Sequence, residues 1–314
     1  MGVSLPNARN GSEVSRWVER QRPPLARPDP EDLPEPLLEE ERTREGRVEP
    51  VATLFLANRE CAFRCVFCDL WRHARASRLA PGEAVAQVRR GLEALVPVPH
   101  VKLYNAGSLF DPGQVPREDL PGIARLLSGF KDVVVESHPA FARRAPAFRD
   151  ALGGTELEVA MGLETAEEAA LARMNKRMTV AGYAAAARWL RSEGIHVRTF
   201  LLHPAPFVPE EEAEEATLRS VGVALDAGSG CVVLVPTRSG NGAMEALADA
   251  GLAPRPTLAS LERVLARALA LSAGRGRVFV DLWDLPLLAA GVEDWEEAAD
   301  RLREMNDTQR PAGA

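Results

Sequence analysis

Three of the chain's four cysteines, Cys61, Cys65 and Cys68, lie in one short segment with the spacing C-x3-C-x2-C. Thiolates this close in sequence can converge on one metal centre, because ten extended residues at roughly 3.4 Å each reach further than a cluster is wide. A structural zinc site needs a fourth protein ligand, which Cys231 or His73 would supply. A [4Fe-4S] cluster held by three cysteines leaves one iron open to bind a small molecule. We favour the cluster and keep the zinc site as the alternative.

The elements that must position this segment form a regular pattern. From Val51 onward, short apolar runs alternate with Ala-rich helical stretches, which indicates βα units and a parallel sheet. The predicted strands are 51–57, 100–104, 132–136, 157–163, 196–202 and 231–235. The predicted helices are 82–95, 117–128, 140–151, 166–193 with a break near Met178, 210–226, 257–273 and 295–305. On pattern alone, six such units fit a partial barrel or a doubly wound sheet.

The same pattern divides the chain into three parts. Residues 1–48 are polar and Pro-rich and include the acidic run 39–41, so we interpret them as an N-terminal extension. Residues 49–285 form the predicted core barrel, in which 278–282 is a further strand that extends or caps the sheet. Residues 286–314 are a C-terminal helix and tail.

Composition narrows the class of protein. The chain has 314 residues, of which 46% are hydrophobic, so it can bury a large core. Four cysteines, three of them clustered, do not form a disulfide framework, and we expect a reducing, cytoplasmic setting. No apolar run approaches the roughly 20 residues that span a bilayer, so no membrane partner is expected. A net charge of −7 argues against a dedicated nucleic-acid binder, although a local basic patch is compatible with it.

The cysteine array resembles that of the radical S-adenosylmethionine (SAM) superfamily. It has the same spacing, an aromatic residue, Phe67, just before the last cysteine, and a β-rich run, 51–57, before the first. The resemblance implies a partial (β/α)6 TIM-type barrel, a [4Fe-4S] cluster whose open iron binds the amino and carboxylate groups of SAM, and reductive cleavage of SAM to a 5′-deoxyadenosyl radical. It further implies that Phe67 packs near the adenine and that a reductant such as flavodoxin or ferredoxin supplies electrons.

In parallel barrels the chemistry lies at the carboxyl ends of the strands, so the residues just after each predicted strand are candidates for the site. Gly107 and Ser108 come after the second strand, where the superfamily has a Gly-Gly-Glu element that receives the SAM amino group. Ser108 replaces the acid, while Gly107 keeps the close backbone approach that glycine permits. Glu136 ends the third strand, and we interpret it either as a contact to SAM or substrate or as part of a helix-capping turn.

Two further candidates come from later strands. Glu164 belongs to a Gly-Leu-Glu-Thr stretch that resembles an element near the SAM ribose in several radical SAM families. Arg198 lies inside a predicted strand, where a guanidinium is costly unless paired, so it is expected to meet the SAM carboxylate or a protein acid such as Glu164. Both are our candidate catalytic residues. His203 and Cys231 are interpreted as structural, the latter as a small buried residue.

Larger stretches, including 104–112, 162–165 and 201–207, resemble the radical SAM subunit of archaeosine synthase and relatives of the Elongator catalytic subunit. That resemblance implies a radical lyase acting on a modified base in tRNA. The alternatives are a radical SAM enzyme acting on a small metabolite or peptide, and, from another class, a non-catalytic metal-binding module. Since only Cys231 is spare, a second cysteine-ligated cluster is not expected.

Overall fold

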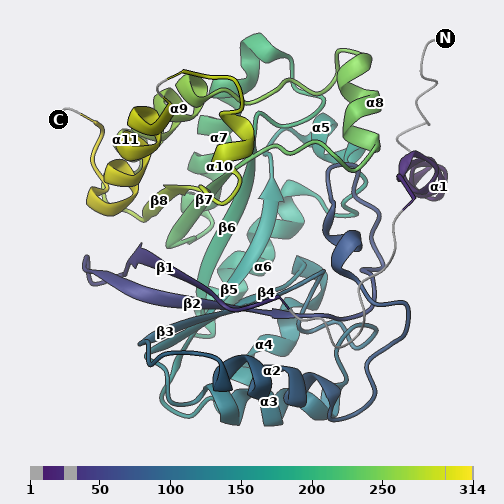
Figure 1. Cartoon of the computed structure of the whole chain (residues 1–314), viewed down its shortest axis with the longest axis vertical. Helices are drawn as coiled ribbons and strands as arrows, with labels where there is room; N and C mark the ends of the chain where they lie inside the picture. Colours follow the sequence, from purple (N-terminus) through teal and green to yellow (C-terminus); the bar gives the residue numbers. More distant parts are fainter. Residues whose placement is uncertain (1–9, 25–33, 294, 313–314) are drawn as a thin grey trace.

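The computed structural model describes residues 10–24, 34–293 and 295–312, and its centre is a single eight-stranded sheet (Figure 1). The strands are β1 (Leu37–Arg42), β2 (Val48–Leu56), β3 (His100–Asn105), β4 (Asp132–Glu136), β5 (Glu156–Glu164), β6 (His196–His203), β7 (Cys231–Pro236) and β8 (Arg277–Val280). Strands β2 to β8 pair in parallel, and β1 pairs antiparallel with β2.

The strand order settles the choice between the two predicted architectures. The strands lie side by side in the same order as in the sequence. A doubly wound sheet reverses its strand order at a switch point, whereas a barrel does not. The sheet is therefore a curled partial barrel, as predicted. The six predicted strands correspond to β2 through β7, the predicted strand 278–282 overlaps β8, and β1 was not predicted.

Helices cover the outer face of the sheet and lie close to the predicted ranges (Figure 1). The α-helices are α1 (Gly11–Gln21), α2 (Glu83–Glu93), α3 (Leu120–Leu127), α4 (Ala145–Ala151), α5 (Glu168–Arg173), α6 (Val180–Ser192), α7 (Ala213–Asp226), α8 (Ala243–Asp249), α9 (Leu258–Ser272), α10 (Leu285–Leu288) and α11 (Trp295–Thr308). The predicted helix 166–193 is two helices, α5 and α6, on either side of the expected break.

The alternation of side chains along each strand explains how one sheet carries both a core and a polar interior. On β3, Val101 and Leu103 are fully buried in the hydrophobic core, whereas Lys102 and Tyr104 line a large internal cavity. On β6, Val197 and Leu201 belong to the same core, and Arg198 and Phe200 line the cavity. The odd and even positions of a strand therefore have different roles: one set packs against the helices, and the other faces the lumen.

Strand β1 occupies the side of the barrel between β2 and β8. It is hydrogen-bonded to β2 along its length, and its other side meets the C-terminal part of the chain through side chains. Arg277 donates to the carbonyl of Arg42 at 2.8 Å, and Arg42 donates to the carbonyl of Asp307 at 2.7 Å. Trp283 donates its indole N–H to Glu39. The acidic run of the predicted extension therefore faces the lumen, with Glu39 and Glu41 among the cavity residues.

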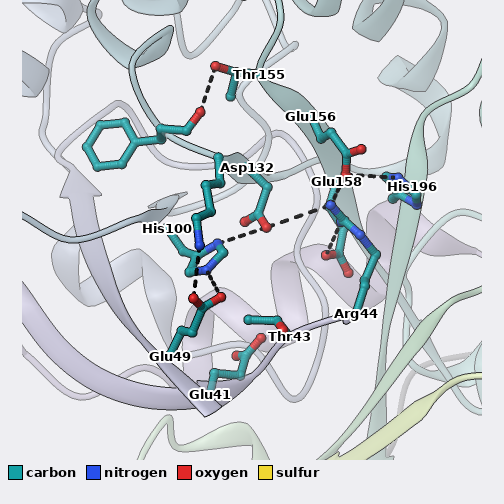
Figure 2. Close-up of polar contacts among 12 residues, drawn as sticks. Glu41, Thr43, Arg44, Glu49, His100, Asp132, Thr155, Glu156, Glu158 and His196 are labelled. Atoms are coloured by element: carbon teal, nitrogen blue, oxygen red, sulfur yellow. Dashed lines mark hydrogen bonds and ion pairs between the residues drawn. The ribbon is translucent and has the colours of Figure 1, made fainter. Parts of the chain in front are cut away.

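The end of the barrel at which β3, β4 and β5 begin is closed by the turn between β1 and β2, which Figure 2 shows in detail. Arg44 reaches from that turn to Glu156 at the start of β5, and it lies 3.7 Å from both Asp132 and Glu158. His100 bridges Asp132 at 2.9 Å and Glu49 at 3.1 Å. This network fixes the turn against the amino ends of three strands, so the lumen is accessible from the carboxyl ends.

Within the described residues, none of the helices is both long and apolar enough to cross a membrane.

Candidate functional site

The cavity lies inside the barrel, reaches the loops at the carboxyl ends of the strands, and has a volume of about 940 Å³. It brings together all nine site residues predicted from the sequence. They are Cys61, Cys65, Phe67, Cys68, Gly107, Ser108, Glu136, Glu164 and Arg198. These residues come from the cysteine loop, from the carboxyl ends of β3, β4 and β5, and from the interior of β6, so their convergence is a property of the fold and not of local sequence.

The cysteine loop is anchored from outside by neighbouring segments. The N–H of Val66 donates to the carbonyl of Met174 at 3.1 Å, and Asn241 donates its side-chain amide to the carbonyl of Val66 at 2.9 Å. Asn175 donates in the same way to the carbonyl of Arg64 at 2.8 Å. The two asparagines were not predicted from the sequence, because each lies more than 100 residues from the loop it holds.

The three thiols of the loop are half-buried and unpaired with one another. Burial raises the pKa of all three above the ordinary range, to about 12 for Cys65. The ligand form of cysteine is the thiolate, so binding a metal here would release protons. Among the described side chains no group of three is arranged to hold a single metal ion. A cubane cluster does not require such a group, because each of its cysteines binds a different iron.

Next to the thiols, the end of β3 provides polar groups that are unpartnered in the part of the chain that the structure describes. Asn105 is only 5% exposed, and neither its side-chain oxygen nor its side-chain nitrogen has a hydrogen-bond partner among those residues, although Asn105 lines the cavity. Buried polar atoms without partners are rare in proteins, so a ligand in the cavity would satisfy them. Gly107 has φ +148°, and a Cβ at this position would collide with Gln114, so glycine is needed here for the packing of Gln114. The amide of Asn105 fits a bound polar molecule such as the amino acid part of SAM.

Two other predicted residues near the thiols, Ser108 and Glu136, already form hydrogen bonds within the protein. The hydroxyl of Ser108 accepts from the N–H of His138 at 2.8 Å, and its own N–H donates to Gln114 at 2.7 Å. Glu136 accepts from the N–H of Asn105 at 3.1 Å. Burial raises the pKa of Glu136 to about 7, so near neutral pH its carboxyl group either donates or accepts a hydrogen bond.

At the end of β5, Glu164 forms an ion pair with Lys176 inside the cavity. Glu164 has φ +67°, an uncommon conformation for a residue other than glycine, at a point where the pairing of β5 with β6 shifts register. A side chain on Gly162 would collide with both members of the pair. Lys176 also lies 5.7 Å from the ring centre of Phe67. Sequence reasoning missed Lys176, whose only signal was its position 12 residues after Glu164.

Arg198 lies deeper in the lumen than Glu164 and pairs with two other acids. Its guanidinium contacts Glu41 of β1 at 2.5 and 3.0 Å and Glu158 of β5 at 3.2 Å. The structure therefore pairs Arg198 with Glu41 and Glu158 instead of Glu164. Burial alone would raise the pKa of Glu41, but Arg198 and Lys102 hold it well below its usual range. Glu41, Lys102 and Arg198 separate the cavity from a space of about 20 Å³ beyond them.

The lumen thus has three levels between this charged floor and the cysteine loop. The floor consists of Glu41, Lys102, Glu158, Arg198 and Arg277. Above it lies an aromatic level of Phe55, Tyr104, Phe200, Phe279 and Trp283, in which Tyr104 has ring-centre distances of 6.2 Å to both Phe200 and Trp283. The thiols, Asn105 and the Glu164–Lys176 pair form the third level, at the strand ends.

His203 and Cys231 lie outside the cavity lining, in keeping with their structural interpretation. His203 is 1% exposed, and its Nδ1 is 2.9 Å from the hydroxyl of Thr217, which itself donates to the carbonyl of Ala213. Nε2 of His203 is buried and has no hydrogen-bond partner among the described residues. Cys231 is fully buried at the start of β7.

The environment of His203 predicts a loss of stability in acid. Burial lowers its pKa to about 4, from 6.5 in the unfolded chain. Between these values the unfolded state binds the proton and the folded state does not, so the free energy of unfolding falls as pH drops from 6.5 to 4, by up to about 3 kcal/mol. Urea unfolding at several pH values should show this slope and should show a smaller one for His203→Gln. An equal slope in both proteins would contradict the assignment; His138, whose pKa is also lowered to about 4, accounts for a residual slope.

Comparisons with known proteins identify the family of this chain. Residues 57–219, about half of the chain, match the family model described as the radical SAM superfamily. Archaeosine synthase subunit beta of Thermococcus kodakarensis is 28% identical over 127 residues, which are 38% of this chain and 39% of that protein.

Solved structures support the fold. Methylornithine synthase (PylB) has a TM-score of 0.57 at 16% identity, over 86% of this chain and 74% of its own. The Elp3 protein of Methanocaldococcus infernus has a TM-score of 0.50 at 13% identity, over 71% and 58%. Taken with three thiols that open on one cavity at the strand ends, the family match shows that this chain belongs to the radical SAM superfamily.

Proposed function

We propose that Cys61, Cys65 and Cys68 hold the [4Fe-4S] cluster of a radical SAM enzyme and that the substrate occupies the lumen below it. Cluster and SAM follow from membership of the superfamily, and together they supply a 5′-deoxyadenosyl radical that abstracts hydrogen. The observation that carries the proposal is the shared cavity: the thiols, the unpartnered amide of Asn105 and the buried ammonium of Lys176 all face it.

The residues at the strand ends have distinct proposed roles toward SAM. Asn105 offers a carbonyl oxygen to the amino group and an amide N–H to the carboxylate group, and Gly107 and Ser108 line the cavity beside it. Lys176 supplies the positive charge that a carboxylate needs in a buried site. Phe67 offers a ring face to the adenine. Glu164 holds Lys176 in place and restrains its direction.

The proposed substrate is a modified base in tRNA. The aromatic level of the lumen gives stacking surfaces for a planar ring, and stacking on aromatic side chains is the usual way in which proteins hold an unpaired base. The similarity to archaeosine synthase subunit beta supports the same assignment. The match covers 39% of that protein, so its substrate is carried over only as a proposal. The charged floor would then meet a polar substituent on the ring.

Nucleoside analysis tests the substrate directly. Total tRNA from a deletion strain would be digested and compared by mass spectrometry with tRNA from the parent strain and from a strain that carries Cys65→Ala. We expect one nucleoside to change in the deletion strain, to be restored by the wild-type gene and to remain changed with Cys65→Ala. Identical nucleosides in all strains would contradict the tRNA assignment and favour a small metabolite or peptide.

Replacement of Lys176 predicts a loss of SAM affinity. The methionine variant, Lys176→Met, removes a charge-assisted hydrogen bond worth about 1.5–3 kcal/mol, so the Kd for SAM should rise roughly 10- to 100-fold. Isothermal titration calorimetry of the anaerobic holoprotein with SAM measures this Kd. Because the single change leaves Glu164 unpaired, the double variant Glu164→Gln/Lys176→Met is the control for folding. A Kd within twofold of wild type in both variants would exclude this role for Lys176.

A further inference from the structure

His138 lines the cavity just after β4, and none of the contacts proposed for the cluster or for SAM involves it. Its side chain and backbone meet three segments that come from distant parts of the sequence: the cysteine loop, the end of β3, and residues 174–179. We call residues 174–179, which connect α5 to α6 and carry Lys176, the lysine loop. His138 therefore lies where the groups proposed to hold SAM come together.

The hydrogen bonds of the His138 ring fix its tautomer. The backbone N–H of Ala140 donates to Nδ1 at 3.1 Å, so Nδ1 carries no proton. Nε2 lies 3.0 Å from the carbonyl oxygen of Lys176, which can only accept, so Nε2 carries the proton and donates it. Burial lowers the pKa of His138 to about 4, which keeps the ring in this neutral form near pH 7. The ring is therefore a fixed donor to the backbone of the lysine loop.

The same residue is held from two other directions. Its ring stacks on Phe63, which lies between Cys61 and Cys65, with ring centres 4.2 Å apart and an angle of 28° between the planes. Its backbone N–H donates to the hydroxyl of Ser108 at 2.8 Å. The segment with the cluster ligands and the end of β3 thus set the position of His138, while its Nε2 reaches the lysine loop.

The lysine loop has a backbone conformation that needs support from outside. Asn175 and Arg177, on either side of Lys176, both have left-handed conformations, with φ +59° and +60°. Residues other than glycine adopt this region at a cost, so contacts with the rest of the protein must hold the loop in it. The cysteine loop supplies two such contacts, to the carbonyl of Met174 and to the side chain of Asn175. His138 supplies a third, to Lys176 itself.

We propose that His138 is a positioning residue that holds the ammonium group of Lys176 where the carboxylate of SAM binds. This inference rests on the proposed function, in which Lys176 meets that carboxylate. The side chain of Lys176 is long, and its ion pair with Glu164 fixes only the direction of its tip. The location of its backbone therefore decides which points of the cavity the ammonium can reach. The hydrogen bond from His138 fixes that backbone relative to the cysteine loop and the end of β3.

Three substitutions of His138 separate the hydrogen bond from the ring stack. His138→Phe keeps an aromatic ring against Phe63 and loses the donor, and His138→Asn has an amide too short to reach the carbonyl of Lys176. His138→Gln keeps an amide N–H close to the position of Nε2 and loses the stack. The matched control is Phe141→Leu, because the ring of Phe141 lies 6.4 Å from His138 and 6.3 Å from Phe63 but does not line the cavity.

Two ligands show whether the effect passes through Lys176. SAM has the carboxylate, and decarboxylated SAM keeps the amino group and the adenosine without it. Isothermal titration calorimetry of the anaerobic holoprotein gives the Kd for both ligands in each variant. Iron content and dithionite-driven formation of 5′-deoxyadenosine are measured on the same preparations. A substitution that only damages the fold weakens the binding of both ligands equally, whereas a displaced ammonium group weakens the binding of SAM alone.

We expect His138→Phe and His138→Asn to raise the Kd for SAM about tenfold and to leave the Kd for decarboxylated SAM within about twofold of wild type. His138→Gln should return the Kd for SAM to within about threefold, and Phe141→Leu should change neither Kd by more than about twofold. Equal weakening of both ligands, an unchanged Kd for SAM in the Phe and Asn variants, or a Gln variant as weak as these two would overturn the proposal. So would the loss of more than about half of the iron in both the Phe and Asn variants, because His138 would then be required for the cluster itself.

Failure of the proposed function gives a different pattern of results. A wild-type holoprotein that forms no 5′-deoxyadenosine, or a Lys176→Met variant that binds SAM as tightly as wild type, would overturn the proposed function and this inference with it. If both of those experiments give the predicted results and the His138 variants do not, only the inference about His138 is overturned.

Discussion

Replacing any one of Cys61, Cys65 and Cys68 by alanine should abolish SAM cleavage, with 5′-deoxyadenosine falling at least about 100-fold, since an incomplete ligand set no longer holds the cluster. Each thiol faces the same cavity from one loop, and its pKa is raised by burial, so it would remain neutral without a metal. Iron and acid-labile sulfide in the anaerobically reconstituted protein should fall in the same variants. Product analysis after dithionite reduction and metal analysis are the two measurements.

The fourth cysteine provides the matched control for this prediction. Cys231 is fully buried at the other end of the lumen and does not line the cavity, so Cys231→Ala should keep its iron, sulfide and SAM cleavage within about twofold of wild type. A zinc site completed by Cys231 would give a different result, because all four cysteine variants would then lose metal. Iron retained in Cys65→Ala, or lost in Cys231→Ala, would contradict the assignment of the ligands.

Removing the buried guanidinium in Arg198→Met should destabilise the fold by about 3 kcal/mol or more, the largest stability effect expected from one substitution in the lumen. Arg198 is 3% exposed and contacts Glu41 and Glu158, whose side chains are 19% and 3% exposed. Without it these carboxylates lose their nearest positive charge in a site of low dielectric constant. Urea unfolding of the apoprotein at neutral pH measures the change in the free energy of unfolding.

Two comparisons separate this effect from the general cost of a substitution. The double variant Glu158→Gln/Arg198→Met removes an acid together with its partner and should recover at least half of the lost stability. The exposed pair of Arg263 and Glu214 should matter little, with Arg263→Met costing less than about 1 kcal/mol. If Arg198→Met and Arg263→Met cost the same, the charged floor of the lumen does not stabilise the barrel.

The sequence predicts the parts of this structure whose signals are local. The cysteine loop is one short segment, so its three cysteines could be proposed as ligands from their spacing, and the structure places all three at one cavity. The strands of the barrel are apolar runs bounded by helical stretches, and six of them agree with the structure to within a few residues. The site residues at strand ends could be proposed because parallel strands bring their carboxyl ends to one edge.

The parts that were missed depend on contacts between distant residues. The run 37–42 has the composition of a solvated acidic stretch, but its alternation turns Glu39 and Glu41 into the lumen, where Lys102 and Arg198 neutralise them. The only sign of these buried acids in the sequence was that two cations, Lys102 and Arg198, lie within predicted strands and need acidic partners from another part of the chain. Lys176 was missed for a related reason. Its ion pair with Glu164 depends on the register shift and the positive φ at Glu164, and neither feature can be recognised in the sequence.

The most direct test of the central assignment is product analysis of the wild-type holoprotein incubated anaerobically with SAM and dithionite. We predict equal amounts of 5′-deoxyadenosine and methionine, formed only when both the reductant and the reconstituted cluster are present. Intact SAM after reduction, in a protein that contains a full complement of iron and sulfide, would contradict the account.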